Sequence, residues 1–162
     1  MRFIIKKMES EDEIKGKAFV HWKSWQEAYQ GIVDSQYLAG MTLEQCIQTA
    51  YRWTDNILVA KDGDRVIGFA GYGKYRNAEL EHAGEVYALY VLVEYYGKGA
   101  GTQLMNEALA LLSDYPKTAV WVLKDNSRAI AFYEHFGFCF DGREEILELG
   151  APVTAVRMIQ QR

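Results

Sequence analysis

Residues 85–112 limit the folds open to this chain more than any other stretch. Residues 85–93 form an almost unbroken apolar run without Gly or Pro, which predicts a central strand buried on both faces. From residue 104 to 112 apolar residues recur at helical spacing, and glycines stand at 97, 99 and 101 between the two. Glycines where a helix begins let free N–H groups approach a ligand at the positive end of the helix dipole. The stretch therefore predicts a site for a phosphate or pyrophosphate.

The two commonest phosphate-binding motifs do not fit this turn. A Walker A loop ends in Gly-Lys-Ser/Thr, whereas Lys98 lies inside the glycine run. A dinucleotide fingerprint needs Gly-x-Gly-x-x-Gly, but the third glycine comes one residue early, at Gly101, and Thr102 stands in its place. Both alternatives are excluded.

Length and composition favour one globular domain, residues 1–162, in the cytoplasm. A hydrophobic fraction of 49% with two prolines excludes a disordered chain, and no apolar run is long enough to span a membrane. The N-terminus reads as a short strand, not a signal peptide. Cys46 and Cys139 stand far apart without clustered histidines, so we expect reduced thiols and no metal. A net charge of −4 argues against nucleic acid as a partner.

The remaining elements alternate between strands and helices. Ser10 and Glu13 make a capping box for a helix over 11–29, and Asp34 or Thr42 caps one or two short helices that end near residue 53. An Asp-Gly turn joins strands 57–61 and 65–72 as an antiparallel hairpin. After the glycine-rich turn come strand 118–123, a helix with Ser127 as N-cap that Gly137 ends, and strands 138–140 and 153–159 joined by the polar segment 141–150. The order predicts an α/β fold: a mixed, mostly antiparallel twisted sheet with helices on both faces.

Two motifs resemble those of the GNAT N-acetyltransferases. Residues 96–101, Tyr-Gly-Lys-Gly-Ala-Gly, resemble the Gln/Arg-x-x-Gly-x-Gly/Ala loop that cradles the pyrophosphate of acetyl-coenzyme A in that family. Residues 126–138 resemble its Asn-x-x-Ala-x-x-Phe-Tyr-x-x-x-Gly-Phe segment, and the order of elements is also that of the GNAT fold. Tyr96 departs from the usual Gln or Arg. The backbone donors do not depend on that side chain, so we expect cofactor binding to survive.

The resemblance implies which residues bind acetyl-coenzyme A. The main chain of the central strand would pair with the pantetheine arm, and Asn126 would hydrogen-bond it. The expected cofactor-binding residues are Leu89, Tyr90, Val91, Gly97, Lys98, Gly99, Ala100, Gly101, Thr102, Asn126 and Tyr133.

Acetyl transfer to an amine needs a base for the amine and a proton for the departing thiolate. The resemblance places the Tyr133 hydroxyl near the sulfur as the acid; the alternative is an aromatic residue that only packs on its helix. The resemblance likewise indicates Glu85 as the base; the alternative is that Glu85 is only a solvated carboxylate at the end of a strand. Glu81, His82 and Glu79 are the other candidate bases.

The acceptor is expected to be a primary amine that attacks directly in a ternary complex. Residues 25–31 resemble the Trp-x-x-x-Tyr-x-Gly segment of a polyamine-acetylating branch. The expected acceptor is therefore a polyamine or, alternatively, a peptide amine. Trp25, Tyr29 and Glu81 would contact it. Three alternatives stay open: a non-catalytic acetyl-coenzyme A sensor or docking module, a longer acyl group, and a hydroxyl acceptor. The family also suggests a homodimer.

Overall fold

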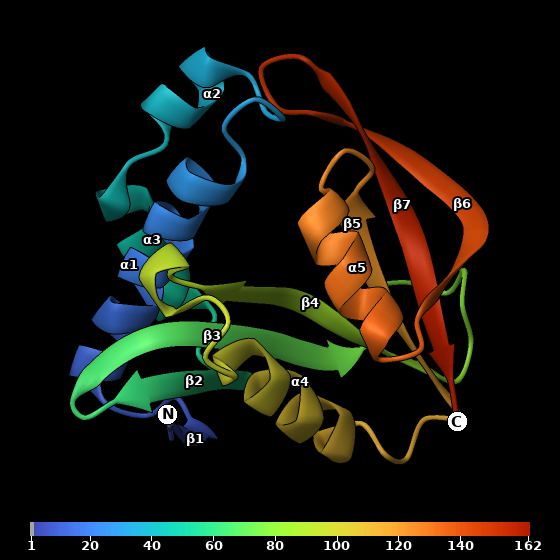
Figure 1. The fold of residues 1–162 in the computed structure, drawn as a ribbon, viewed down its shortest axis with the longest axis horizontal. Coiled ribbons are helices and arrows are strands. Elements are labelled where there is room, and N and C mark those ends of the chain that lie inside the picture. Colours follow the sequence, from blue (N-terminus) through green and yellow to red (C-terminus); the bar gives the residue numbers. More distant parts are fainter. Residues whose placement is uncertain (1) are drawn as a thin grey trace.

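The computed structural model describes residues 2–162 as one mixed sheet with helices packed on it (Figure 1). The strands are β1 (Ile4–Lys7), β2 (Ile57–Asp62), β3 (Arg65–Lys74), β4 (Ala83–Val91), β5 (Lys117–Leu123), β6 (Cys139–Glu148) and β7 (Pro152–Gln161). The helices are α1 (Glu11–Ala28), α2 (Ser35–Gly40), α3 (Leu43–Arg52), α4 (Ala100–Leu111) and α5 (Ser127–His135), with the 3₁₀ turn η1 (Val93–Tyr95).

The parallel contact between β4 and β5 positions the site. The strand order is β1-β2-β3-β4-β5-β7-β6, and all other neighbours in the described sheet run antiparallel. β4 and β5 pair only over residues 83–85 and 117–119. Beyond Glu85, β4 continues along β3 while β5 continues along β7. The two strands therefore part, and the sheet opens between them.

A bulge in β4 lies at the start of this opening. Gly71 faces Ala88 and Tyr72 faces Val86, so Tyr87 is an extra residue opposite β3. A bulge of this kind bends the strand and increases its twist, which turns the second half of β4 away from β5.

Helices cover both faces of the sheet. α1 packs on β3 and β4 with α3 against it, while α4 packs on the opposite face, against β2, β3 and β4 (Figure 1). Leu104, Met105 and Ala108 of α4 are fully buried, as are Ala18 and Val20 of α1. Each large apolar side chain buried in this way contributes about 2 kcal/mol to folding. α5 lies beside α4, since the Phe132 ring is the nearest neighbour of Gly101.

The structure confirms the predicted fold class and most of the helix caps. The Ser10–Glu13 capping box begins α1, Asp34 caps α2, and Thr42 with Gln45 caps α3. One cap prediction is wrong: Asn126, not Ser127, caps α5, because the Asn126 Oδ1 accepts a hydrogen bond from the Ala129 N–H at 3.2 Å. No helix among residues 2–162 is long and apolar enough to cross a membrane.

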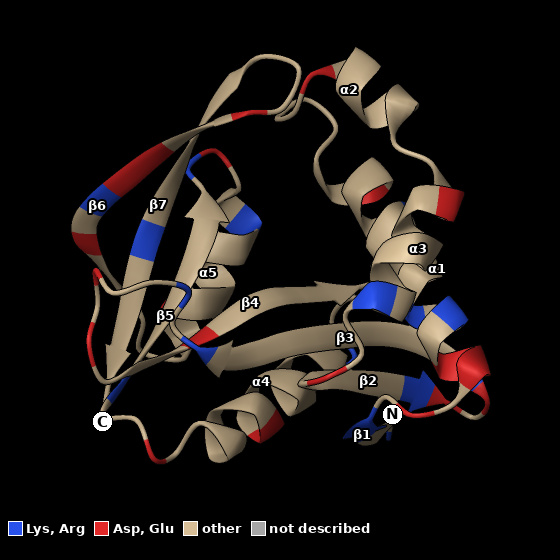
Figure 2. Cartoon of the chain, turned by 180° about the vertical axis from the view of Figure 1, so that it is seen from behind, with Lys and Arg blue, Asp and Glu red and all other residues tan. Residues whose placement is uncertain are grey.

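Two strand predictions also need correction. Residues 141–148, expected as a connecting segment, belong to β6, an edge strand in which charged residues are frequent (Figure 2) and most residues are exposed. β6 is held in place by its backbone pairing with β7. Because few of its side chains are buried, its sequence lacks the alternation of apolar and polar residues that marks a half-buried strand. β4 is not buried throughout: Tyr87 is 47% exposed and residues 88–90 are half-buried, because this part borders the opening.

Candidate active site

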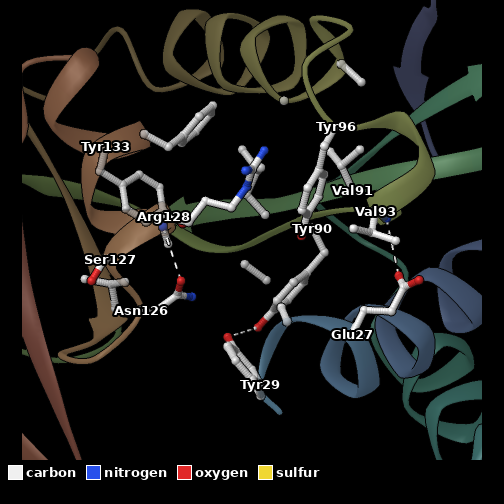
Figure 3. Close-up of a pocket in the computed structure, with 18 of the residues that line it drawn as sticks. Glu27, Tyr29, Tyr90, Val91, Val93, Tyr96, Asn126, Ser127, Arg128 and Tyr133 are labelled. Carbon is white, nitrogen blue, oxygen red and sulfur yellow. Dashed lines mark hydrogen bonds between the residues drawn. The ribbon is translucent and has the colours of Figure 1, made fainter. Parts of the chain in front are cut away.

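A cavity of about 630 Å³ fills the opening between β4 and β5. Its walls are the second half of β4, the turn from η1 into α4, the first turns of α5 and the end of α1 (Figure 3). Because these elements are far apart in the sequence, the cavity depends on the parting of the two strands.

The glycine-rich turn forms one end of this cavity and provides open backbone donors. Gly97 and Gly99 have φ values of +75° and +92°, which side chains rarely adopt. Gly99 is the N-cap of α4 and has no side chain to cap it, so the N–H groups of the first turn are free for an anion. A Cβ on Gly101 would lie 3.3 Å from the Phe132 ring. The residues of the turn therefore fit a pyrophosphate.

The other predicted cofactor residues lie around the same cavity, with one exception. Leu89, Tyr90 and Val91 line it from β4, and Ala100 and Thr102 from α4. On its β5 side this part of β4 has no partner strand among the described residues, which leaves main-chain groups for an extended ligand. Asn126 lines the cavity while it caps α5. Lys98 is exposed outside the lining, and its Nζ lies 5.5 Å from the centre of the Tyr95 ring.

Three tyrosines line the cavity. The Tyr29 and Tyr90 hydroxyl oxygens are 3.0 Å apart, and Tyr133 lines the cavity from α5 (Figure 3). Burial, and secondarily Tyr90, raises the pKa of Tyr133, and burial also raises the pKa of Tyr29 and Tyr90. All three hydroxyls therefore keep their protons at neutral pH and can donate hydrogen bonds.

Trp25, predicted as an acceptor contact, packs behind this group. Its ring lies edge-on to Tyr29 with 4.8 Å between ring centres, and it is not part of the cavity lining. Its Nε1 is buried without a hydrogen-bond partner among residues 2–162. Trp25 therefore supports the position of Tyr29 and does not itself reach the cavity.

Glu85 lies beside the cavity, and its carboxylate is fully occupied. The side chain is 0% exposed, and Arg76 donates to it from the backbone N–H at 3.1 Å and from the guanidinium Nε and Nη2. Val86, the next residue, lines the cavity but Glu85 does not. Its assignment as the base is not tested by this geometry and stays a prediction.

The reserve bases lie on the loop between β3 and β4, also outside the cavity lining. The Glu79 carboxylate pairs with Arg143 at 2.9 Å. Glu81 and His82 are exposed, and His82 has a φ of +54°. The structure thus brings none of the three to the cavity wall.

Three charged residues of the lining were missed from the sequence: Glu27, Asp125 and Arg128. Glu27, near the end of α1, accepts a hydrogen bond from the Val93 N–H at 3.3 Å. It stands between Trp25 and Tyr29, and a helix turns residues two positions apart to different faces, so only the fold reveals that it reaches the cavity. Arg128, in the first turn of α5, stacks on Tyr96 with its Cζ 4.0 Å from the ring centre.

A parted mixed sheet with a glycine-rich helix start in the gap defines a domain that binds a phosphate-bearing cofactor in an extended form. Residues 19–138 match the family model described as "Acetyltransferase (GNAT) family". The chain belongs to the GNAT family and is an acetyl-coenzyme A-dependent N-acetyltransferase.

Known proteins resemble the chain over nearly its whole length. It is 29% identical to the uncharacterized N-acetyltransferase YuaI of Bacillus subtilis, over 91% of this chain and 84% of that protein. The crystal structure of PH1933 from Pyrococcus horikoshii superposes with a TM-score of 0.77 at 26% identity, covering 99% of both chains. The PaiA N-acetyltransferase from Thermoplasma acidophilum, solved in complex with coenzyme A, has a TM-score of 0.75 at 22% identity and covers both chains completely. The last likeness shows the fold alone.

Proposed function

We propose that the enzyme acetylates a primary amine by direct attack in a ternary complex, with Tyr133 as the proton donor. The observation that carries the proposal is one cavity lined both by the glycine-rich turn and by Tyr133 (Figure 3). A cofactor held by its phosphates at the turn and by β4 along its length would extend toward the tyrosines. Acetyl-coenzyme A supplies the acetyl group as an activated thioester.

Tyr133 suits the role of donor through its protonation. Because burial raises its pKa, the hydroxyl stays neutral at all ordinary pH values. Its oxygen has no hydrogen-bond partner among the described residues, so the proton is free for an incoming group. A hydroxyl in that position stabilises the charge that develops on a departing sulfur.

The base is proposed to be Glu85, acting through a water molecule. An alkylamine with a pKa near ~10 must lose a proton before it attacks, and a carboxylate next to the cavity can accept it. Arg76 already donates hydrogen bonds to the Glu85 carboxylate. For Glu85 to act as the base, one of its oxygens must also accept a hydrogen bond from the water molecule. Glu27, which reaches the cavity directly, is the alternative carboxylate.

The part of the cavity near Trp121, where we place the acceptor, has an aromatic surface and charged residues of both signs. Trp121 lines the cavity, with the Arg76 and Arg157 guanidinium carbons 5.5 and 5.9 Å from its ring. Acidic residues around the site could favour a polyamine, but three of them are paired: Glu79 with Arg143, Glu85 with Arg76 and Glu144 with Lys124. The proposal therefore stays with a primary amine, and a panel of polyamines, amino acids and peptides is needed to find the acceptor.

The test is free-thiol release from acetyl-coenzyme A with that panel, for the wild type and Tyr133→Phe. Loss of the hydroxyl is expected to lower kcat about 100-fold and leave coenzyme A binding within about threefold. Tyr72→Phe is the matched control, because Tyr72 is a buried tyrosine that does not line the cavity. Equal kcat for the two variants would contradict the role of Tyr133, and absence of release with every amine would contradict the acceptor class.

A homodimer remains a prediction. β6 is an edge strand of the described sheet, and Phe140 and Ile146 on it are 51% and 74% exposed. Gel filtration with light scattering measures the oligomeric state directly.

A further inference from the structure

Arg128 occupies a position that local helix chemistry does not favour. It follows Ser127 in the first turn of α5, where the positive end of the helix dipole repels a cation. The arginines Arg65, Arg76, Arg143 and Arg157 each pair with a carboxylate. Among residues 2–162 no carboxylate lies within ion-pair distance of Arg128. A cation without a counter-charge next to a helix start indicates that an anion belongs there.

Tyr96 holds the Arg128 guanidinium on its ring. The two residues come from opposite walls, Tyr96 from the turn before α4 and Arg128 from α5 (Figure 3). The Tyr96 backbone is fixed by its N–H bond to the Val93 carbonyl at 3.0 Å, and its ring packs against the main core. Burial, which outweighs the opposing effect of Arg128, raises the pKa of Tyr96, so the stack is formed with a neutral ring.

Stacking leaves the guanidinium available for a phosphate. A planar guanidinium uses its face against an aromatic ring and its edge for N–H donors, so one group can do both. Arg128 lines the same cavity as the glycine-rich start of α4, whose first N–H groups have no side-chain cap. Charge-assisted and bidentate contacts of this kind are the strongest that arginine makes with phosphate.

We propose that Arg128 binds the pyrophosphate of coenzyme A and that Tyr96 is the positioning residue which holds the guanidinium for it. The proposal rests on coenzyme A binding in this cavity. It also accounts for Tyr96 at the position where the family usually has Gln or Arg: the polar contact comes from α5, and the turn supplies the platform. Arg128 and Tyr96 together would thus make the contact that one Gln or Arg side chain makes in other members of the family.

The test is calorimetric titration with coenzyme A, which needs no turnover. Arg128→Gln is expected to weaken binding about tenfold at low salt, and less at high salt, where charges are screened. Tyr96→Phe keeps the ring and should bind like the wild type. Tyr96→Leu should lose about threefold in the wild-type background and nothing in the Arg128→Gln background, since Tyr96 acts through Arg128. Arg52→Gln, an exposed arginine of α3 outside the cavity, controls for the change in net charge.

Three results would overturn the proposal. Equal affinities of Arg128→Gln and Arg52→Gln would remove Arg128 from the site. Equal losses for Tyr96→Leu with and without Arg128 would mean that Tyr96 acts on its own. A loss in Arg128→Gln that disappears with dephospho-coenzyme A would assign Arg128 to the 3′-phosphate, not the pyrophosphate. If the wild type itself fails to bind coenzyme A, the proposed function fails first, which keeps the two failures distinct.

Discussion

Two buried glutamates, Glu13 and Glu85, are held in different ways. Glu13 is 4% exposed and accepts hydrogen bonds from the Nζ groups of Lys6 and Lys61 and from the N–H groups of Glu9 and Ser10. All donors to Glu85 come from Arg76. Four separate residues thus fix the first carboxylate, and one residue fixes the second.

The two carboxylates therefore differ in how many residues hold them. Burial alone would raise the pKa of Glu13, but the bonds from Lys6, the two N–H groups and Lys61 lower it to about 2. Such a carboxylate keeps its charge and ties α1 to β1 and β2. Glu85 stands next to the cavity, and Arg76, its only donor, also stacks on Trp121 in the cavity wall. The Glu85 carboxylate therefore depends on a single residue for all its hydrogen bonds.

The largest expected effect separates the two glutamates by turnover. Glu85→Gln should lower kcat about 100-fold, because an amide cannot take the proton of the amine. Glu13→Gln should stay within about twofold of the wild type, since Glu13 does not line the cavity. Free-thiol release measures both, with coenzyme A affinity as a check on folding. Similar kcat values for the two would give Glu85 a purely structural role, and Glu27→Gln would then be the variant to measure.

The next effect concerns the partner of Glu85. Arg76→Met leaves a wholly buried carboxylate without its counter-charge, which typically lowers the free energy of unfolding by about 3–5 kcal/mol. For a chain of this length the melting temperature should fall by roughly 10 °C. The double variant Arg76→Met with Glu85→Leu should recover most of the loss, because neither charge remains. Urea denaturation measures all three proteins.

If the double variant is as unstable as Arg76→Met, pairing with Glu85 is not the reason that Arg76 stabilises the chain. That result would show that Arg76 stabilises the chain through its stack on Trp121. Arg143→Met is the control, since its pair with Glu79 is exposed and should contribute less than about 1 kcal/mol.

The Glu13 anchor predicts how stability depends on pH. Because the folded pKa of about 2 lies below the ordinary 4.5, the stabilisation is complete above pH 4.5 and disappears as the pH falls toward 2. The difference between these values corresponds to about 3 kcal/mol. Glu13→Gln should therefore lower stability at pH 7 and flatten its dependence between pH 5 and pH 2. An acid transition as steep as that of the wild type would mean that other carboxylates control it.

The same contrast explains what the sequence could and could not predict. The Ser10–Glu13 box spans four residues, and the glycine-rich turn spans five, so each is visible in one reading of the chain. The Arg76–Glu85 pair closes across a loop, and the stack of Arg128 on Tyr96 joins two elements, so both require the fold. Residues 141–148 of β6 were missed because this part of the edge strand is polar and mostly exposed, without a clear apolar alternation. Contacts between residues close in sequence could be predicted, whereas side-chain contacts that join separate elements could not.

The smallest expected effect comes from a third carboxylate, Glu144 on β6. Its pair with Lys124 spans 3.6 Å, and the two side chains are 51% and 60% exposed. Solvent screens such a pair, so Glu144→Gln should change the free energy of unfolding by less than about 0.5 kcal/mol. Urea denaturation of Glu144→Gln and Glu13→Gln, measured together, tests whether burial of the carboxylate, and not ion pairing alone, determines how much the free energy of unfolding changes. A loss for Glu144→Gln as large as that for Glu13→Gln would break the comparison, because an exposed carboxylate with one partner would then stabilise the chain as much as a buried one with four.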